Sequence, residues 1–413
     1  MAVLVAALGY FVDIYDLLLF SIIRVESLTS LGLTPEQLTT DGESIISWQM
    51  MGLLLGGILW GVLGDKKGRL SVLFGSIILY SLANIANGMV TTVGQYAAVR
   101  FIAGLGLAGE LGAGITLVAE LTPKEKRGVA TSLVAGIGLT GAVVAFIIKE
   151  NFHWRTCYFI GGGLGLALLL LRISVFESGM FHQVKQLKVQ RGNFFMFFTN
   201  GDRFKRYILA ILIGLPTWFV IGVLVTFSKE FAEHFGIKDK VDSGKAIMFA
   251  YAAISLGDIV VGLVSQWFKS RKKALFLFYG ITIFFMVLYF TVLWNSTAGT
   301  MYWICAGLGF GTGFWAIFIT MGAEQFGTNL RATAATTIPN MVRGLLAIAI
   351  IPLFKWLRGM EGVGFVQGGM YAAIILMAIT LLAGALTRET FGKDLNFVEE
   401  DPIDSTEGSN IAA

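Results

Sequence analysis

Charged residues are scarce in this chain. Only 14% of its 413 residues are charged while 55% are hydrophobic, and the mean hydropathy is +0.74. A soluble domain carries about a quarter charged residues, so this composition is unsuited to a surface that faces water. The Lys and Arg residues lie mainly in short loops between apolar segments, and the net charge of +4 therefore gives no indication of nucleic-acid binding. The composition favours a protein whose outer surface faces lipid.

Cysteine, histidine and proline are scarce as well. The two cysteines, Cys157 and Cys305, lie in or beside apolar segments, which excludes a disulfide framework. No pair among the three histidines has the spacing of metal ligands, so we expect no metal and no cofactor. There are only six prolines, whereas the 51 glycines suit helices that pack closely within lipid.

Long apolar runs are what the sequence has in abundance. A helix needs about 20 apolar residues to cross the hydrocarbon core, and barrel strands would alternate apolar with polar residues. The runs here are continuous, so we predict an all-α membrane protein with twelve spanning helices. The predicted spans are 2–24, 44–64, 70–90, 94–121, 127–149, 154–176, 207–230, 243–268, 273–295, 299–323, 331–357 and 363–387.

One connector, residues 177–206, is longer and more polar than the others and contains six Lys and Arg residues. It separates the sixth predicted span from the seventh. We therefore predict an N-terminal six-helix bundle at 1–176, a cytoplasmic linker at 177–206 and a C-terminal six-helix bundle at 207–388. The polar, acidic stretch 389–413 is predicted to be a disordered cytoplasmic tail.

The distribution of basic residues predicts the orientation. Loops after even-numbered spans, together with the tail, hold 19 of the 31 Lys and Arg residues, and loops after odd-numbered spans hold 9. Basic loops stay in the cytoplasm, so both termini are predicted to be cytoplasmic. The compact loops are typical of a bacterial inner (plasma) membrane protein.

A short element occurs twice. Residues 119–127 and 323–331 both read Ala-Glu-x6-Arg, and their separation of 204 residues also moves the start of the first span to that of the seventh. Such repetition indicates two pseudo-symmetric halves. The alternative is a chance similarity between two short polar segments.

The loop at residues 61–69, Gly-Val-Leu-Gly-Asp-Lys-Lys-Gly-Arg, resembles the G-x-L-x-D-x-x-G-R signature of the major facilitator superfamily. In that pattern Gly61 permits close helix contact, and Asp65 caps a helix or pairs with an arginine. The alternative is a plain hairpin whose Lys and Arg residues only set topology. That alternative does not explain the full spacing.

Further segments resemble one branch of this superfamily. They are residues 100–110, which look like R-F-x-x-G-x-G-x-G-G-E, the E-x6-R-G element from Glu120, and the element at 323–333. The branch includes sugar porters, metabolite:proton symporters and aromatic-acid:proton symporters. Gly327 stands in place of the usual proline, and the second-half loop near 262–273 has Ser265 or Gln266 where an acid would be. The glutamine pair of sugar porters is not evident, which makes a sugar a weaker candidate substrate.

The resemblance implies two halves that rock around a central site, with ion pairs that close the cytoplasmic side. The predicted cytoplasmic gate comprises Asp65, Arg69, Glu120, Arg127, Glu324 and Arg331.

Ionisable residues within membrane spans indicate function. Asp13 and Asp16 lie three residues apart and therefore share a helix face. Asp16 and Arg100 match an acid–arginine pair of proton-coupled sugar porters, and separation of such a pair would favour protonation of the acid. The alternative for this pair is a permanent salt bridge. Glu110 is predicted to be a second proton carrier or a partner of Arg343.

Arg343 is predicted to bind the substrate, because a guanidinium holds a carboxylate with two hydrogen bonds. The alternative is a structural arginine paired with Glu110 or Asp258. Trp218 and Trp315 could form cavity walls, although a lipid-facing or packed position is equally open. The full set of predicted substrate-binding residues is Arg343, Asp13, Glu110, Trp218, Trp315 and Asn340.

Together these features predict a secondary active transporter that moves a small organic anion, such as a carboxylate, with protons by alternating access. The first alternative is a proton-antiport exporter of a drug, metabolite or siderophore. The second is a membrane receptor with a transporter fold. No nucleophile–base pair indicates an enzyme. The expected partners are a small-molecule substrate, protons and the lipid bilayer, with the chain a monomer.

Overall fold

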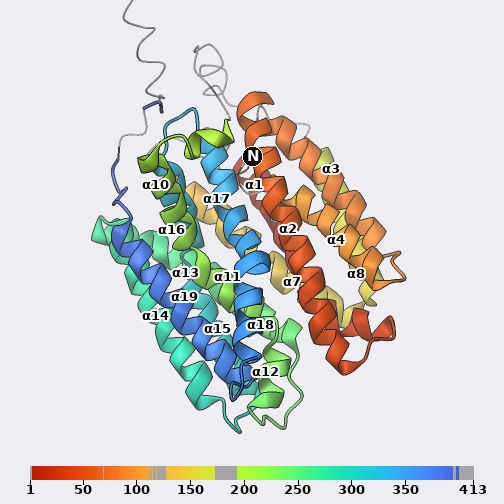
Figure 1. Cartoon of the computed structure of the whole chain (residues 1–413). Helices are drawn as coiled ribbons and strands as arrows, with labels where there is room; N and C mark the ends of the chain where they lie inside the picture. Colours follow the sequence, from red (N-terminus) through yellow and green to blue (C-terminus); the bar gives the residue numbers. More distant parts are fainter. Residues whose placement is uncertain are drawn as a thin grey trace, which may run out of the picture.

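The computed structural model describes residues 2–110 except residue 68, residues 112, 114 and 118, and the ranges 127–172, 193–393 and 397–399. For residues 2, 65, 69, 70, 127–132, 172 and 332 only the backbone is described. All regular elements within these ranges are helical (Figure 1).

The first part of the chain contributes α1 (Ala2–Ser30), α2 (Pro35–Lys67), α3 (Arg69–Asn87), α4 (Val93–Leu107), α6 (Arg127–Leu139), α7 (Gly141–Asn151) and α8 (Trp154–Arg172). The second part contributes η1 (Phe194–Phe197), α10 (Gly201–Leu212), α11 (Leu215–Phe219), η2 (Val220–Val225), α12 (Ser228–His234), α13 (Ser243–Phe268), α14 (Arg271–Val292), α15 (Ala298–Thr312), α16 (Trp315–Glu324), α17 (Arg331–Leu345), η3 (Leu346–Ile350), α18 (Ile351–Arg358) and α19 (Phe365–Leu386).

Ten helical stretches of the described chain are long and apolar enough to cross a membrane. Two shorter apolar helices, at 71–87 and 93–107, take the places of the third and fourth predicted spans. The edges agree closely, since α13 begins and ends at the predicted 243 and 268. The prediction of an all-helical, multi-span protein is therefore confirmed.

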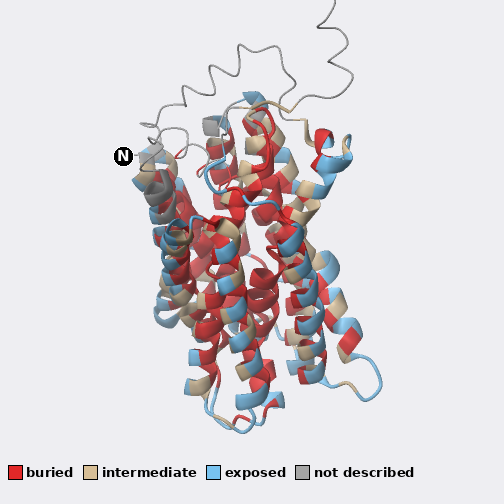
Figure 2. Ribbon diagram, turned by 90° about the vertical axis from the view of Figure 1, so that its left-hand side faces the viewer, coloured by how far each residue is buried: buried red, intermediate tan, exposed pale blue. Residues whose placement is uncertain are grey.

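The outer surface of the bundle is apolar, as a lipid-facing surface requires. Large side chains such as Trp267 and Trp303 point outward with 80% and 71% exposure. Many polar and charged side chains, such as Asp16 and Arg100, are instead buried inside the bundle. Figure 2 shows that buried residues fill the interior, under a surface of exposed and intermediate residues.

Helices α1 to α8 pack mainly against one another, and so do α10 to α19. Contacts between the two groups run along α2 with α17 and along α6 and α7 with α13. The predicted boundaries at 176 and 206 fall partly in 173–192, outside the described residues, and the division into domains stays a prediction. We use "terminal face" for the end of the bundle that holds residue 2 and the start of α17, and "far face" for the opposite end (Figure 1).

Glycine sets the closest helix contacts in both halves. A Cβ atom on Gly104 of α4 would overlap the backbone carbonyl oxygen of Gln49 in α2. The same type of contact recurs 205 residues later, where a Cβ on Gly309 of α15 would overlap the carbonyl of Ala250 in α13. Small residues allow this backbone approach, which stabilises helix pairs in lipid through van der Waals contact.

Two spans contain a widened π turn, η2 in the seventh and η3 in the eleventh. The turns pack against each other, since Gly222 leaves room only for the side chain of Leu346. A π turn disturbs the backbone ladder, and a free carbonyl is costly in lipid. Side chains satisfy these carbonyls: Thr226 Oγ1 donates to Ile221 O, and Tyr289 Oη donates to Leu224 O at 2.9 Å.

The glycine contact between α2 and α4 is testable. We expect Gly104→Ala to separate the two helices and lower the melting temperature of the purified protein by several degrees, in line with about 1–3 kcal/mol for an overpacked core. Gly280→Ala is the matched control, because its Cβ would meet nothing within 4 Å in the middle of α14. Equal melting temperatures for the two variants would contradict this account of the packing.

Candidate functional site

Arg343 lies at the centre of the bundle, near the end of α17, with 1% of its surface exposed. Its Nη1 donates to Asn340 Oδ1 at 3.2 Å. Asn340 in turn donates to the backbone carbonyl of Ala108, at the end of α4, at 2.9 Å. The guanidinium is therefore positioned at the contact between the two halves.

The two predicted tryptophans face this guanidinium. The Arg343 Cζ atom lies 5.6 Å from the ring centroid of Trp218 and 5.9 Å from that of Trp315. The two rings meet edge to face with centroids 6.4 Å apart. Both are buried, which excludes the lipid-facing alternative. The indole N–H of Trp218 has no hydrogen-bond partner among the described residues.

Tyr10 of α1 and Tyr251 of α13 complete the surroundings of Arg343, and sequence analysis identified neither of them. Both hydroxyls lie within electrostatic reach of the Arg343 guanidinium and of Asp13. Asp13 is fully buried. The structure thus brings Asp13, Arg343, Asn340 and both tryptophans into one region; their role in binding stays a prediction.

The acid–arginine pair has a different geometry from the one expected. Arg100 Nη2 donates to the backbone carbonyl of Asp16 at 2.9 Å, and Nη1 donates to Asn84 Oδ1 at 3.3 Å. In the described structure no ion pair joins Arg100 to the Asp16 carboxylate. That carboxylate packs against Gly161 of α8, where an added Cβ would lie 2.5 Å from Oδ1.

Two further buried acids have distinct surroundings. Asp258 Oδ1 accepts a hydrogen bond of 3.0 Å from the backbone N–H of Ala316, at the break between α15 and α16. It therefore caps α16, and it forms no ion pair with Arg343 in the described structure. Glu110 is 1% exposed, and its role stays a prediction.

The predicted cytoplasmic gate is described only in its second half. The side chains of Asp65, Arg69, Glu120 and Arg127 lie outside the described residues. Glu324, at the end of α16, forms a bidentate ion pair with Arg271, with both N–O distances 2.8 Å. Arg331, at the start of α17, is half-buried.

Glu389 supplies the acid that the second-half loop lacks in sequence. Its carboxylate accepts hydrogen bonds from Ser270 Oγ and from the backbone N–H groups of Arg271 and Lys272 at the start of α14. Although partial burial acts in the opposite direction, these hydrogen bonds lower the pKa of Glu389 to about 2. The carboxylate therefore remains ionised and caps α14 at neutral pH.

Comparisons with known proteins identify the family. The sequence matches the Major Facilitator Superfamily over residues 6–352, most of the chain. The chain belongs to the Major Facilitator Superfamily. It is therefore a multi-pass membrane transporter and not an enzyme.

Several transporters of this superfamily are similar in sequence. The niacin transporter of Acinetobacter baylyi is 26% identical over 95% of each chain. The cis,cis-muconate transport protein of the same organism is 27% identical over 89% of this chain and 90% of its own. A putative metabolite transport protein of Haemophilus influenzae is 29% identical, over only 57% of this chain and 56% of its own length.

The fold is that of a solved D-xylose-proton symporter, with a TM-score of 0.69 over 95% of this chain and 99% of the other. The sequences are 16% identical. This likeness confirms the superfamily fold, with spanning helices in two bundles.

Among the described residues, three ion-pair groups join the two halves at the far face, and sequence analysis missed all of them. Arg24 at the end of α1 is fully buried, and its Nη2 lies 2.7 Å from Glu230 Oε1 of α12. Arg24 also donates to the backbone carbonyls of Leu38 and Thr226, and its Cζ lies 4.6 Å from the Phe227 ring centroid.

The second group surrounds Glu43 of α2, which is 1% exposed. Arg358 of α18 binds both of its oxygens, at 2.9 and 3.2 Å, and Lys355 Nζ lies 2.9 Å from Oε2. In the third group, Lys149 at the end of α7 lies 2.7 Å from Asp242, the N-cap of α13. These contacts hold the far face closed.

The far-face pairs give a direct test. Removing one partner of a buried charge pair costs about 2–5 kcal/mol, so we expect Glu230→Gln to increase the population with a separated far face. Spin labels on Glu36→Cys and Lys240→Cys, both exposed on opposite halves, would report a longer distance component.

Glu233→Gln is the matched control for this test. It removes the same charge from α12, but its pair with Lys229 is exposed and spans 3.9 Å. Exposed pairs contribute little, so its distance distribution should match that of the parent protein. An unchanged distribution in Glu230→Gln would show that Arg24–Glu230 does not hold the face closed.

Proposed function

We propose that this transporter moves a small organic anion of the carboxylate class together with protons, by alternating access. The observation that carries the proposal is the state of Arg343. It is buried at the contact between the halves, and no carboxylate among the described residues forms an ion pair with it. The alternative of a structural arginine paired with Glu110 or Asp258 therefore lacks support.

An unpaired guanidinium inside a membrane protein is costly, because no water solvates its charge. The Trp218 and Trp315 faces recover part of that cost through cation–π attraction. A carboxylate would recover more, since it accepts two parallel hydrogen bonds from the guanidinium fork. The Trp218 indole N–H is a further donor in the same region.

The relatives support an acidic substrate. Two relatives that align over about nine-tenths of both chains are named for niacin and for cis,cis-muconate transport. Both compounds are carboxylic acids, and their common feature is the group that Arg343 would bind.

Proton coupling is proposed to involve Asp16. Because Arg100 bonds to the backbone of Asp16 and to Asn84, the Asp16 carboxylate is not fixed by an ion pair. A change in the position of Arg100 would alter the charge that acts on Asp16 and so its affinity for a proton. Asp13 and Glu110 remain candidate participants.

Alternating access is supported by the position of the charges. The far-face pairs join the halves on one side of Arg343, and the described part of the predicted gate, Glu324 at the end of α16 and Arg331 at the start of α17, lies towards the other side. The distribution of Lys and Arg assigns the terminal face to the cytoplasm. With this orientation, the site at Arg343 opens to the cytoplasm while the far-face pairs are formed. The opposite rocking movement separates those pairs.

Arg343→Met tests the anion site. We expect it to abolish binding of nicotinate and muconate in calorimetric titration while leaving the melting temperature unchanged or higher, because no acid among the described residues forms an ion pair with Arg343. Arg343→Lys should bind at least tenfold more weakly, since Lys offers no bidentate fork. Normal binding by Arg343→Met would refute the proposed site.

Asp16→Asn tests the coupling role. We expect the variant to retain counterflow exchange in proteoliposomes and to lose accumulation driven by a pH gradient, since the site can no longer gain or lose a proton. Asp41→Asn, in α2 away from Arg100, is the control and should accumulate substrate normally. If Asp16→Asn still concentrates substrate against a gradient, the residue is structural.

A further inference from the structure

Gly327 is the residue that departs from the family element, and the backbone of residues 397–399 packs against it. A Cβ on Gly327 would stand 2.6 Å from the backbone nitrogen of Glu399, 2.9 Å from the carbonyl carbon of Val398 and 3.0 Å from the carbonyl oxygen of Phe397. The φ angle of Gly327 is not in the left-handed region, so its own backbone would accept a side chain. The three described atoms nearest to such a Cβ all belong to the backbone of residues 397–399.

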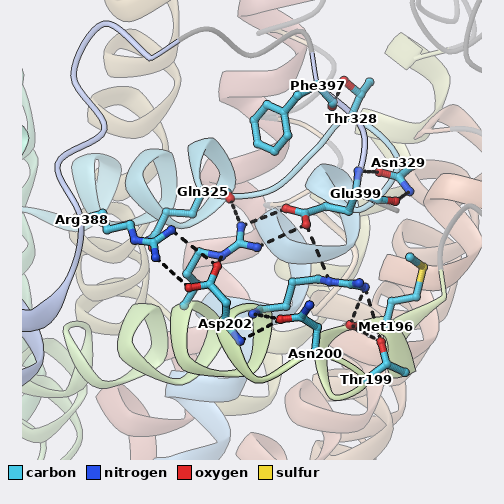
Figure 3. Close-up of polar contacts among 12 residues, drawn as sticks. Met196, Thr199, Asn200, Asp202, Gln325, Thr328, Asn329, Arg388, Phe397 and Glu399 are labelled. Atoms are coloured by element: carbon cyan, nitrogen blue, oxygen red, sulfur yellow. Dashed lines mark hydrogen bonds and ion pairs between the residues drawn. The ribbon is translucent and has the colours of Figure 1, made fainter. Parts of the chain in front are cut away.

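The loop between α16 and α17 holds the backbone of this segment. Thr328 N–H donates to the Phe397 carbonyl at 2.8 Å. The Asn329 side-chain amide binds residue 399 from both sides, because its Nδ2 donates to the Glu399 carbonyl at 2.9 Å and its Oδ1 accepts from the Glu399 N–H at 3.0 Å. The Asn329 amide thus forms with Glu399 the two backbone hydrogen bonds that a neighbouring β-strand would otherwise form (Figure 3).

The Glu399 side chain adds a charge contact. Its carboxylate binds Arg206 of α10 through two hydrogen bonds of 2.9 and 3.2 Å, and Arg203 Nε lies 3.7 Å away. The three side chains are largely buried, with exposures of 11%, 12% and 2% for Glu399, Arg206 and Arg203. Arg206 is held in place by Asp202 and lies 5.0 Å over the Phe326 ring.

We propose that this surface, which we name the tail dock, recognises an acidic peptide in extended conformation, and that residues 397–399 of the chain itself are its occupant. The tail dock comprises Arg203, Arg206, Gly327, Thr328 and Asn329. Thr328 and Asn329 bind the peptide backbone, Gly327 provides the close approach, and Arg206 selects a carboxylate.

The position of the tail dock gives it a mechanical role. It joins the start of α10, the loop before α17 and the segment after α19. Helix α17 then packs against α2 of the other half, where Gly57 lies against Asn340 and Gly61 against Thr337. A docked tail therefore steadies the start of the helix that carries Arg343, and an undocked tail removes the Glu399 carboxylate from Arg206, which keeps its ion pair with Asp202.

An anionic lipid headgroup is the main competing occupant, because phosphate also pairs with arginine. A phosphate offers acceptors only, however, whereas the Asn329 amide presents a donor and an acceptor together. The backbone of one peptide residue satisfies both groups, whereas a phosphate group by itself satisfies only the Asn329 donor.

The test uses the full-length protein in nanodiscs of zwitterionic phosphatidylcholine, with hydrogen–deuterium exchange at the amides of Thr328 and Glu399 as the readout. We expect Gly327→Ala to raise exchange at both amides at least tenfold, since the added methyl displaces the segment without removing a charge. Gly201→Ala, on the same face with nothing within 4 Å of its Cβ, is the control and should leave exchange unchanged.

Glu399→Gln separates the two parts of recognition. It keeps the backbone contacts and removes the ion pair, so exchange at both amides should rise several-fold but less than in Gly327→Ala. Unchanged exchange in Gly327→Ala would overturn the proposal. Loss of protection in the parent protein when phosphatidylglycerol replaces phosphatidylcholine would show that lipid is the preferred occupant and would also overturn it.

Discussion

A charge inside the hydrocarbon layer must be compensated by the protein, because no water is available to solvate it. This constraint accounts for where the polar groups of the transporter lie. The outer surface carries many large apolar side chains, and several of the buried charges lie where the two halves meet. Arg343, Arg24 and Glu43 all lie at that contact. The hydrophobic effect contributes little between helices in lipid, so close packing, hydrogen bonds and ion pairs together hold the halves to each other.

The buried charges at the contact between the halves are of two kinds, and the difference determines how a ligand can shift the conformational equilibrium. Arg24 and Glu43 are fully paired across the halves, which favours the closed far face. Arg343 has cation–π and amide contacts but no acid among the described residues. An anion that binds to Arg343 changes the electrostatic energy at the centre of the bundle. The far-face pairs lower the free energy of the conformation in which the far face is closed. A ligand shifts such an equilibrium only through this differential stabilisation.

Much of the fold could be predicted from hydropathy, because about 20 continuous apolar residues leave few alternatives to a spanning helix. The bounds of α13 illustrate this. The meeting of Arg343 with Trp218 and Trp315 was also predictable, since all three lie at similar depth. Hydropathy could not show the breaks within spans, such as the one at α15–α16, because both sides of each break are equally apolar.

Contacts between segments that are distant in the sequence could not be predicted either, for a different reason. Arg24 and Glu230 lie at the ends of separate spans, and only the packed bundle brings them together. Arg100 was matched to Asp16 by family pattern, and the pattern could not specify that the backbone would be the acceptor. Sequence analysis identified Gly327 as a departure from the family element at 323–333. The structural reason for a glycine there became clear only from the position of residues 397–399.

The two π turns have a consequence for the direction in which later side chains point. A π turn accommodates one residue more than an α turn, so side chains after η2 or η3 are rotated by about 100° from an uninterrupted helix. Glu230 and Arg358 both follow such a turn and both face the other half. The rotation of each helix about its axis therefore decides, together with its charged residues, whether the far-face ion pairs can form. A one-residue deletion within η2 would turn Glu230 away from Arg24 while leaving both charges in place.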